Sequence, residues 1–269
     1  MKLLTLNTHS IIEEDCDIKL TYLANAISGI KPDVIALQEV SQTSSLSILD
    51  ADSKYGVVSM RSDISIKADN YAVNLCKELH NRDAHYNCLW LPIKRGYENL
   101  DEGVAILSRS NICDADIVNL SLNDDYNSWK TRKGLGIKLS DNTWYYSLHF
   151  GWWDDVKEPF SAQWQRFTES VRGKKVWAMG DFNSPDNIRD EGYDLVSRSG
   201  WYDSYICAEK KDDGITVDRT IEGWNLDSNK KRIDYIFSNY KEDIDSSKVI
   251  FNGINREIVS DHFGVMISY

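Results

Sequence analysis

VWAMGDFNSPDN, residues 176–187, joins a short apolar run to a cluster of polar residues. Val176–Met179 has the composition of a buried strand, and Pro185 turns the chain away after it. Asp181 and Asn183 stand two positions apart, so in an extended chain their side chains point the same way. An ordinary exit from a strand into a loop explains this pattern as well as a functional site does. Other segments must therefore decide between the two.

Segments with strand or helix patterns fill the rest of the chain. Runs with strand character predict strands at 2–7, 33–38, 87–93, 103–108, 113–120, 134–139, 143–149, 175–180, 232–238, 247–251 and 263–268. Apolar stripes at helical spacing predict helices over 17–28, 70–82 and 160–172. These elements predict an α/β (α+β) fold in which two sheets pack face to face with helices outside. No repeat or Pro/Gly-rich linker interrupts the chain, so we expect a single domain over residues 1–269.

Composition narrows the class of protein. The 269 residues are 42% hydrophobic and 27% charged, as in a globular domain. No apolar run approaches the length of a membrane span, and the N-terminus does not have the pattern of a signal peptide. Five scattered cysteines without a C-x-x-C pair favour reduced thiols in a cytoplasmic protein. The net charge of −11 argues against binding duplex DNA, but a phosphate substrate remains compatible because a bound divalent cation can reverse the local field.

Polar side chains that can bind metal or move protons stand at the ends of several predicted strands: Asn7, Glu39, His149, Asp181, Asn183, Asp261 and His262. Asp234 differs, because it lies inside an apolar strand, where a carboxylate is costly unless it is paired. His262 is an available partner, and such a pair orients the imidazole and favours its charged form. Taken singly, each residue also fits a solvated strand end or a structural role.

The joint pattern predicts a metal-assisted hydrolase of phosphoesters. Asn7, Glu39 and Asp261 offer oxygen ligands and no thiolate, which suits Mg²⁺ or Mn²⁺ better than zinc. We expect Asp181 to orient or deprotonate an attacking water, and Asn183 to donate to a phosphate oxygen.

The stretches LTLNTH, PDVIALQEV, SLHF, MGDFNSP, RIDYIF and SDHFGV, in this order, resemble the motifs of the endonuclease/exonuclease/phosphatase superfamily, which has the deoxyribonuclease-I-like fold. The resemblance spans nearly the whole chain and implies a four-layered α-β-β-α sandwich with the site where the sheets meet. It also implies the roles of the site residues: metal-binding Glu39 with Asn7 and Asp261, water-activating Asp181 with Asn183, the pair Asp234 and His262, and phosphate-facing His149. One departure is His9, which stands where the nuclease branch often has an acidic residue.

Peripheral segments supply candidate substrate-binding residues. Trp152 and Trp153 in HFGWWDDVKEPFSAQW, residues 149–164, form a sugar-stacking platform or pack beneath the sheet rim. Glu102 and Arg109 come from GYENLDEGVAILSR, residues 96–109, where Arg109 either clamps a phosphate or is a surface charge. Arg132 belongs to a basic cluster that either guides phosphate or is solvated.

The first two of these segments are similar to those of bacterial maltose 6'-phosphate phosphatases, a cytoplasmic branch of the superfamily. The resemblance implies a Mg²⁺-dependent phosphatase acting on a small phosphorylated sugar such as maltose 6'-phosphate. The main alternative is a Mg²⁺-dependent DNA endonuclease or exonuclease of the same fold, since the core motifs do not separate these activities. A lipid-headgroup phosphodiesterase is favoured less, because we find no basic amphipathic helix. A binding module that has lost the chemistry would not keep the full set of polar groups.

Overall fold

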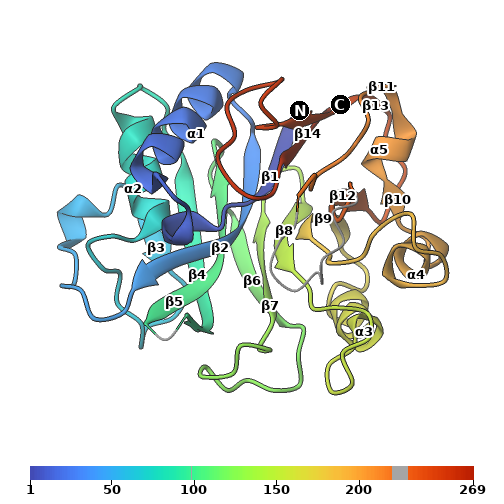
Figure 1. The fold of residues 1–269 in the computed structure, drawn as a ribbon, viewed down its shortest axis with the longest axis horizontal. Coiled ribbons are helices and arrows are strands. Elements are labelled where there is room, and N and C mark those ends of the chain that lie inside the picture. The colour runs from blue at the N-terminus through green and yellow to red at the C-terminus, as the bar shows by residue number, and fades with distance from the viewer. Residues whose placement is uncertain (98, 220–229) are drawn as a thin grey trace.

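The computed structural model describes residues 1–97, 99–219 and 230–269, and Figure 1 shows their two central sheets. The strands of the first sheet are β1 (Lys2–Asn7), β2 (Val34–Thr43), β3 (Val57–Ser59), β4 (Asn87–Gly96), β5 (Leu100–Ser108), β11 (Ala208–Lys211), β13 (Ile244–Ile250) and β14 (Gly264–Ser268). Those of the second sheet are β6 (Asp114–Asn119), β7 (Lys133–Lys138), β8 (Thr143–His149), β9 (Lys175–Asp181), β10 (Tyr202–Asp203) and β12 (Asp234–Ser238). Their orders are β11-β13-β14-β1-β2-β5-β4-β3 and β10-β12-β9-β8-β7-β6.

Helices cover the outer face of each sheet. They are α1 (Cys16–Ile30), α2 (Tyr71–His80), α3 (Phe160–Ser170), α4 (Gly192–Arg198) and α5 (Ser204–Cys207), with short 3-10 turns at Ser10–Ile12 and Ala51–Ser53. In Figure 1, α1 and α2 lie on one side of the sheets, and α3 and α4 lie on the other. The predicted four-layered α-β-β-α sandwich is confirmed.

Alternation along the strands divides the buried side chains among the layers. Leu4 and Leu6 of β1 belong to the core under α1 and α2, whereas Leu3 packs into the core between the sheets. A third core, which includes Phe160 and Phe167, joins α3 to the second sheet. All of the predicted strands and helices are present within a few residues. The unpredicted β3, β10, β11, α4 and α5 are short segments in which periodicity gives little signal.

Gly180 continues β9 rather than ending it. Its φ of +147° is one that other residues rarely adopt, and a Cβ there would lie 1.9 Å from the carbonyl oxygen of Leu148. Glycine therefore lets β9 approach β8 closely enough to place Asp181 directly beside His149 in the parallel register.

All five cysteines are free in the structure. Within the described ranges, the helices are too short or too polar to cross a membrane.

Candidate active site

A cavity of about 460 Å³ brings together groups from both sheets. It is lined by His9, Glu39, Lys94, Gly96, Tyr97, Glu102, Trp129, Arg132, His149, Trp152, Asp181, Asn183, Asp261 and His262. Most of the residues predicted from the sequence are in this lining. The exceptions are Asn7, Asp234, Arg109 and Trp153.

Strand direction explains the convergence. β1 runs parallel to β2, and β8 runs parallel to β9, so the polar residues at their carboxyl ends meet at one edge. β12 is antiparallel to β9, and its first residue, Asp234, pairs with Asp181. The expected clustering of distant chain segments is therefore present.

Glu39 reaches the cavity from a bulge within β2 rather than from the strand end that the sequence suggested. The strand continues to Thr43, but its pairing with β5 shifts between Leu37 and Val40. Glu39 has a φ of +54°, and bulges of this kind commonly redirect a side chain at a functional site. Burial raises the pKa of Glu39, and the charges of Glu102 and Asp261 raise it further.

Asn7 lies between two carboxylates. Its side-chain Nδ2 donates to Glu39 Oε1 at 2.8 Å and to Asp181 Oδ2 at 3.2 Å, while its Oδ1 accepts from the backbone of His9 at 3.2 Å. In this amide orientation Asn7 holds the two carboxylates side by side, and its Oδ1 keeps a second lone pair, so its role as a metal ligand stays a prediction.

Asp181, Asp234 and His262 form a buried acid–base group. Nδ1 of His262 bonds Asp234 Oδ2 at 2.9 Å, which confirms the predicted pair, and its Nε2 lies 3.9 Å from Asp181 Oδ2. Burial lowers the pKa of His262, but the charge and hydrogen bond of Asp234 outweigh it and hold the pKa well above its ordinary range. Burial raises the pKa of Asp181 to about 7, assisted by the charge of Asp234.

His149 lies on the other side of Asp181 and near Glu39. Its Nε2 lies 3.6 Å from Asp181 Oδ2 and 3.4 Å from Asn183 Nδ2. Burial holds the pKa of His149 well below its usual range, and the positive charges of Arg132 and Lys94 lower it further. The two histidines nearest Asp181 thus have pKa values shifted in opposite directions.

Arg132 is a buried cation in the cavity wall. The residue is 5% exposed, yet its guanidinium makes no hydrogen bond to any described residue. Trp152 lies beside it, with the guanidinium 6.0 Å from the ring centroid. The donors of Arg132 are therefore available to an anionic ligand.

Two predicted substrate-binding residues lie elsewhere. Arg109 follows β5, which runs antiparallel to β2, so it lies beside Asp33 at the end of β2 opposite to the bulge. The expectation of a phosphate clamp at Arg109 is therefore not supported by its position. Trp153 packs against the core under α3, so the packing role, rather than stacking on a ligand, describes this tryptophan.

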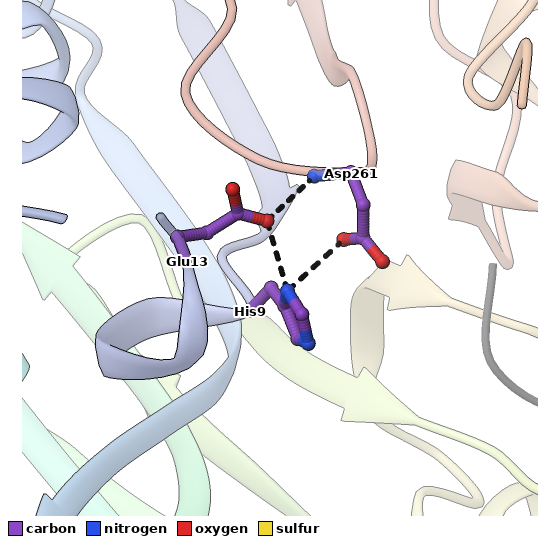
Figure 2. Close-up of side chains that lie close together, drawn as sticks. All are labelled: His9, Glu13 and Asp261. Carbon is purple, nitrogen blue, oxygen red and sulfur yellow. Dashed lines mark hydrogen bonds and ion pairs between the residues drawn. The ribbon is translucent and has the colours of Figure 1, made fainter. Parts of the chain in front are cut away.

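His9 closes one side of the cavity through contacts that the sequence did not suggest (Figure 2). Its Nδ1 lies 2.8 Å from Glu13 Oε1 and 4.0 Å from Asp261 Oδ1, and Glu13 Oε1 also accepts from the backbone of Asp261 at 3.0 Å. Burial lowers the pKa of His9, but the bond to Glu13 and the neighbouring carboxylates raise it to about 9. A charged imidazole thus stands near Asn7, where the nuclease branch often has an acidic residue.

Two groups in the described part of the chain have ligand atoms within 4.8 Å of one another and could hold a metal ion: His9, Glu13 and Asp261, and the buried Asp181, Asp234 and His262. In the second group, Oδ1 of Asp234 is buried without a hydrogen-bond partner among the described residues. The buried group next to the cavity therefore combines two carboxylates with an oxygen that has no hydrogen-bond partner among the described residues.

Comparison with known proteins agrees with this geometry. The model of the Endonuclease/Exonuclease/phosphatase family matches residues 4–262. The chain belongs to this family. An endonuclease/exonuclease/phosphatase family protein from Leptotrichia buccalis C-1013-b has 34% sequence identity and a TM-score of 0.87, over 100% of this chain and 98% of its own. Functionally curated proteins include no match to this chain.

More distant solved structures share the fold of the family. A mannosyl-6-phosphatase from Bacteroides thetaiotaomicron VPI-5482 has 17% identity and a TM-score of 0.65, over 100% of this chain and 98% of its own. A 3' phosphatase from Neisseria, bound to a product DNA hairpin, has 18% identity and a TM-score of 0.65, over 100% and 99%. As a member of the endonuclease/exonuclease/phosphatase family, the protein is a phosphoester hydrolase. Enzymes of this family typically depend on a divalent metal ion.

Proposed function

We propose that this protein is a divalent-metal-dependent phosphomonoesterase that removes phosphate from a phosphorylated sugar such as maltose 6'-phosphate. The observation that carries the proposal is the shared cavity. One space of small-molecule size joins Asp181 and the Asp234-bonded His262 to Arg132, whose guanidinium has no partner among the described residues, and to Trp129 and Trp152.

Asp181 is the proposed acceptor of the proton of an attacking water. Its side chain is 2% exposed, its Oδ1 accepts from the backbone of Asn183 at 2.8 Å, and Asn7 holds its other oxygen. A carboxylate with a pKa of about 7 is a stronger base than an ordinary aspartate, and about half of it is ionised at pH 7. The contacts leave Asp181 one fixed orientation from which to take the proton.

Cationic and neutral donors around Asp181 suit a phosphoryl group. The imidazolium of His262 is held in place by Asp234, so it can donate to phosphoryl oxygens or to the leaving alcohol. His149 in its neutral form still has one ring N–H to donate. Arg132 offers its guanidinium donors in the planar arrangement that matches phosphate oxygens.

Glu39 and Asp261 would hold the cation, with Mg²⁺ or Mn²⁺ as the ion that their oxygen ligands favour. The fit rests on charge: burial and neighbouring carboxylates raise the pKa of Glu39, and a cation would offset that repulsion. When bound, such an ion neutralises phosphate charge and lowers the pKa of water.

The choice of a sugar phosphate has three supports. Trp129 and Trp152 line the cavity, and their rings meet edge-on with centroids 5.9 Å apart. The net charge of −11 suits a small substrate better than a polyanionic strand. The mannosyl-6-phosphatase of similar fold acts, by its name, on a phosphorylated sugar.

A substrate screen tests the proposal. The purified protein is assayed with maltose 6'-phosphate, glucose 6-phosphate, p-nitrophenyl phosphate, supercoiled plasmid and a 3'-phosphorylated oligonucleotide, each with Mg²⁺ and then with excess EDTA. We expect phosphate release from sugar phosphates that EDTA abolishes and that added Mg²⁺ or Mn²⁺ restores. Turnover of DNA without turnover of any sugar phosphate would replace the proposal with a nuclease or a DNA-end phosphatase.

The pH dependence of the wild-type enzyme provides a separate prediction. Because Asp181 must be ionised to accept a proton, kcat/KM should fall as the pH is lowered through its pKa. Burial and the charge of Asp234 raise that pKa to about 7, whereas a bound cation favours the carboxylate and lowers it. We therefore expect the acid limb at or somewhat below pH 7, with about a tenfold loss per pH unit beneath it. Initial rates over pH 5–9 at constant ionic strength check this.

A further inference from the structure

Lys94 and Glu102 form a buried ion pair in the cavity wall. Nζ of Lys94 lies 3.1 Å from Oε1 of Glu102, and the two side chains are only 9% and 8% exposed. They face each other across the antiparallel strands β4 and β5. Burying two charges costs free energy, and a well-packed apolar pair is often as stable or more stable. A buried pair facing a cavity is therefore better explained by ligand binding than by fold stability.

The pair has one donor and one acceptor that no described residue uses. The Lys94 ammonium donates to the backbone oxygen of Trp129 at 3.1 Å and contacts Glu102, which leaves one of its three donors. Oε2 of Glu102 accepts no hydrogen bond from the described residues. A Cβ at Gly96 would lie 2.5 Å from this oxygen, so the glycine makes room for it. One donor and one acceptor thus stand side by side and match two neighbouring hydroxyl groups, each of which can accept or donate.

Trp129 adds an apolar face beside these polar atoms. Its side chain lies in the cavity lining and is 54% exposed, while its backbone carbonyl is held by Lys94. An exposed indole at a cavity rim is typical of a binding surface. A pyranose ring has the matching chemistry, because its C–H face is apolar and its hydroxyls lie around the edge.

The pair also adjoins the proposed phosphate end of the cavity. A small recess is lined jointly by Lys94, Glu102, Arg132 and His149. A ligand whose phosphate lies against Arg132 and His149 would therefore place its first sugar ring against the ion pair.

We propose that Lys94, Glu102 and Trp129 form the subsite that selects the alcohol part of the substrate, by binding a vicinal diol of a pyranose ring whose apolar face lies on Trp129. This inference rests on the proposed sugar phosphatase activity and assigns the residues that determine its specificity.

The test compares a substrate that carries hydroxyls with one that does not. For each variant, Glu102→Gln and Lys94→Met, kcat/KM is measured with maltose 6'-phosphate and with p-nitrophenyl phosphate. The ratio of the first value to the second should fall about 10- to 100-fold, because a hydroxyl of the sugar loses its charged partner. The fall should come mainly from a higher KM for the sugar phosphate. An unchanged ratio would overturn the subsite. Wild-type enzyme without activity on any sugar phosphate would instead overturn the proposed function, so the two failures are distinguishable.

Trp129→Ala tests the same subsite if the ion-pair variants fail to fold. Because the Trp129 side chain is largely exposed, its removal should leave the fold intact. We expect the same fall in the substrate ratio. Unphosphorylated maltose, titrated into the wild type without metal, should change tryptophan fluorescence, and Trp129→Ala should lose this signal. An unaltered signal and ratio in Trp129→Ala would place the sugar elsewhere.

Discussion

Asp181→Asn is expected to lower kcat by about 10²- to 10⁴-fold, the range typical for loss of a positioned general base. The amide keeps the size of the carboxylate but has no useful affinity for a proton. KM should change little, because the proposed phosphate contacts come from Arg132, His149 and His262. Steady-state kinetics on the best sugar phosphate, with saturating Mg²⁺, measure both parameters.

The stability of Asp181→Asn separates loss of chemistry from loss of fold. The pKa of Asp181 is raised on folding, so its contribution favours the native state at low pH and is lost as the pH rises towards about 7. At pH 8 the variant should therefore melt at or above the temperature of the wild-type apoprotein. Asp186→Asn, on the same loop but outside the cavity lining, is the matched control and should keep kcat. Full turnover by Asp181→Asn would show that another group is the base.

Much of this site was predictable because polar residues at the ends of apolar runs indicate which side chains lie at the edge of a sheet. Asn7, His149 and Asp181 each end a short apolar run, and parallel neighbours bring such ends to one edge. Asp234 was informative for a different reason, since a carboxylate within an apolar strand requires a partner, and the structure supplies His262.

Arg109 shows what the local pattern could not determine. Its segment was correctly expected to be a strand, but periodicity does not tell which neighbour a strand pairs with or in which direction. Because β5 is antiparallel to β2, Glu102 near its beginning reaches the cavity, whereas Arg109 after its end lies beside Asp33. Two residues of one segment were thus separated by the length of a strand.

Lys94 and Trp129 were not predicted, although the sequence contains a usable signal for Lys94 and none for Trp129. Lys94 follows an apolar run and faces Glu102 across a hairpin; like Asp234, it is a charge beside apolar strand residues that requires a partner. Trp129 lies in a loop, where no periodicity indicates which way a side chain points. Trp152 and Trp153 illustrate the same point, because only the first of two adjacent tryptophans lines the cavity.

Asp234→Asn should lower kcat by about 10²- to 10⁴-fold although Asp234 is not in the cavity lining. Its carboxylate raises the pKa of His262 and fixes the ring through a 2.9 Å bond, so its removal leaves an imidazole that is neutral over more of the pH range and free to turn. The donor that faces the phosphoryl oxygens is then lost. Kinetics at saturating substrate, together with NMR titration of the His262 ring, measure the two effects.

The same pair predicts a pH-dependent loss of stability. The pKa of His262 is raised on folding, so the stability it contributes is fully present below about pH 6.5 and declines as the pH rises towards the folded-state value. The difference in Tm between wild type and Asp234→Asn should therefore be larger at pH 6 than at pH 9. Asp203→Asn is the matched control, because it breaks the buried pair with Arg232 outside the cavity. It should lower Tm but leave the kcat of the folded enzyme unchanged. If both variants lost activity only in proportion to unfolded protein, Asp234 would be a structural carboxylate and His262 would need no charge for catalysis.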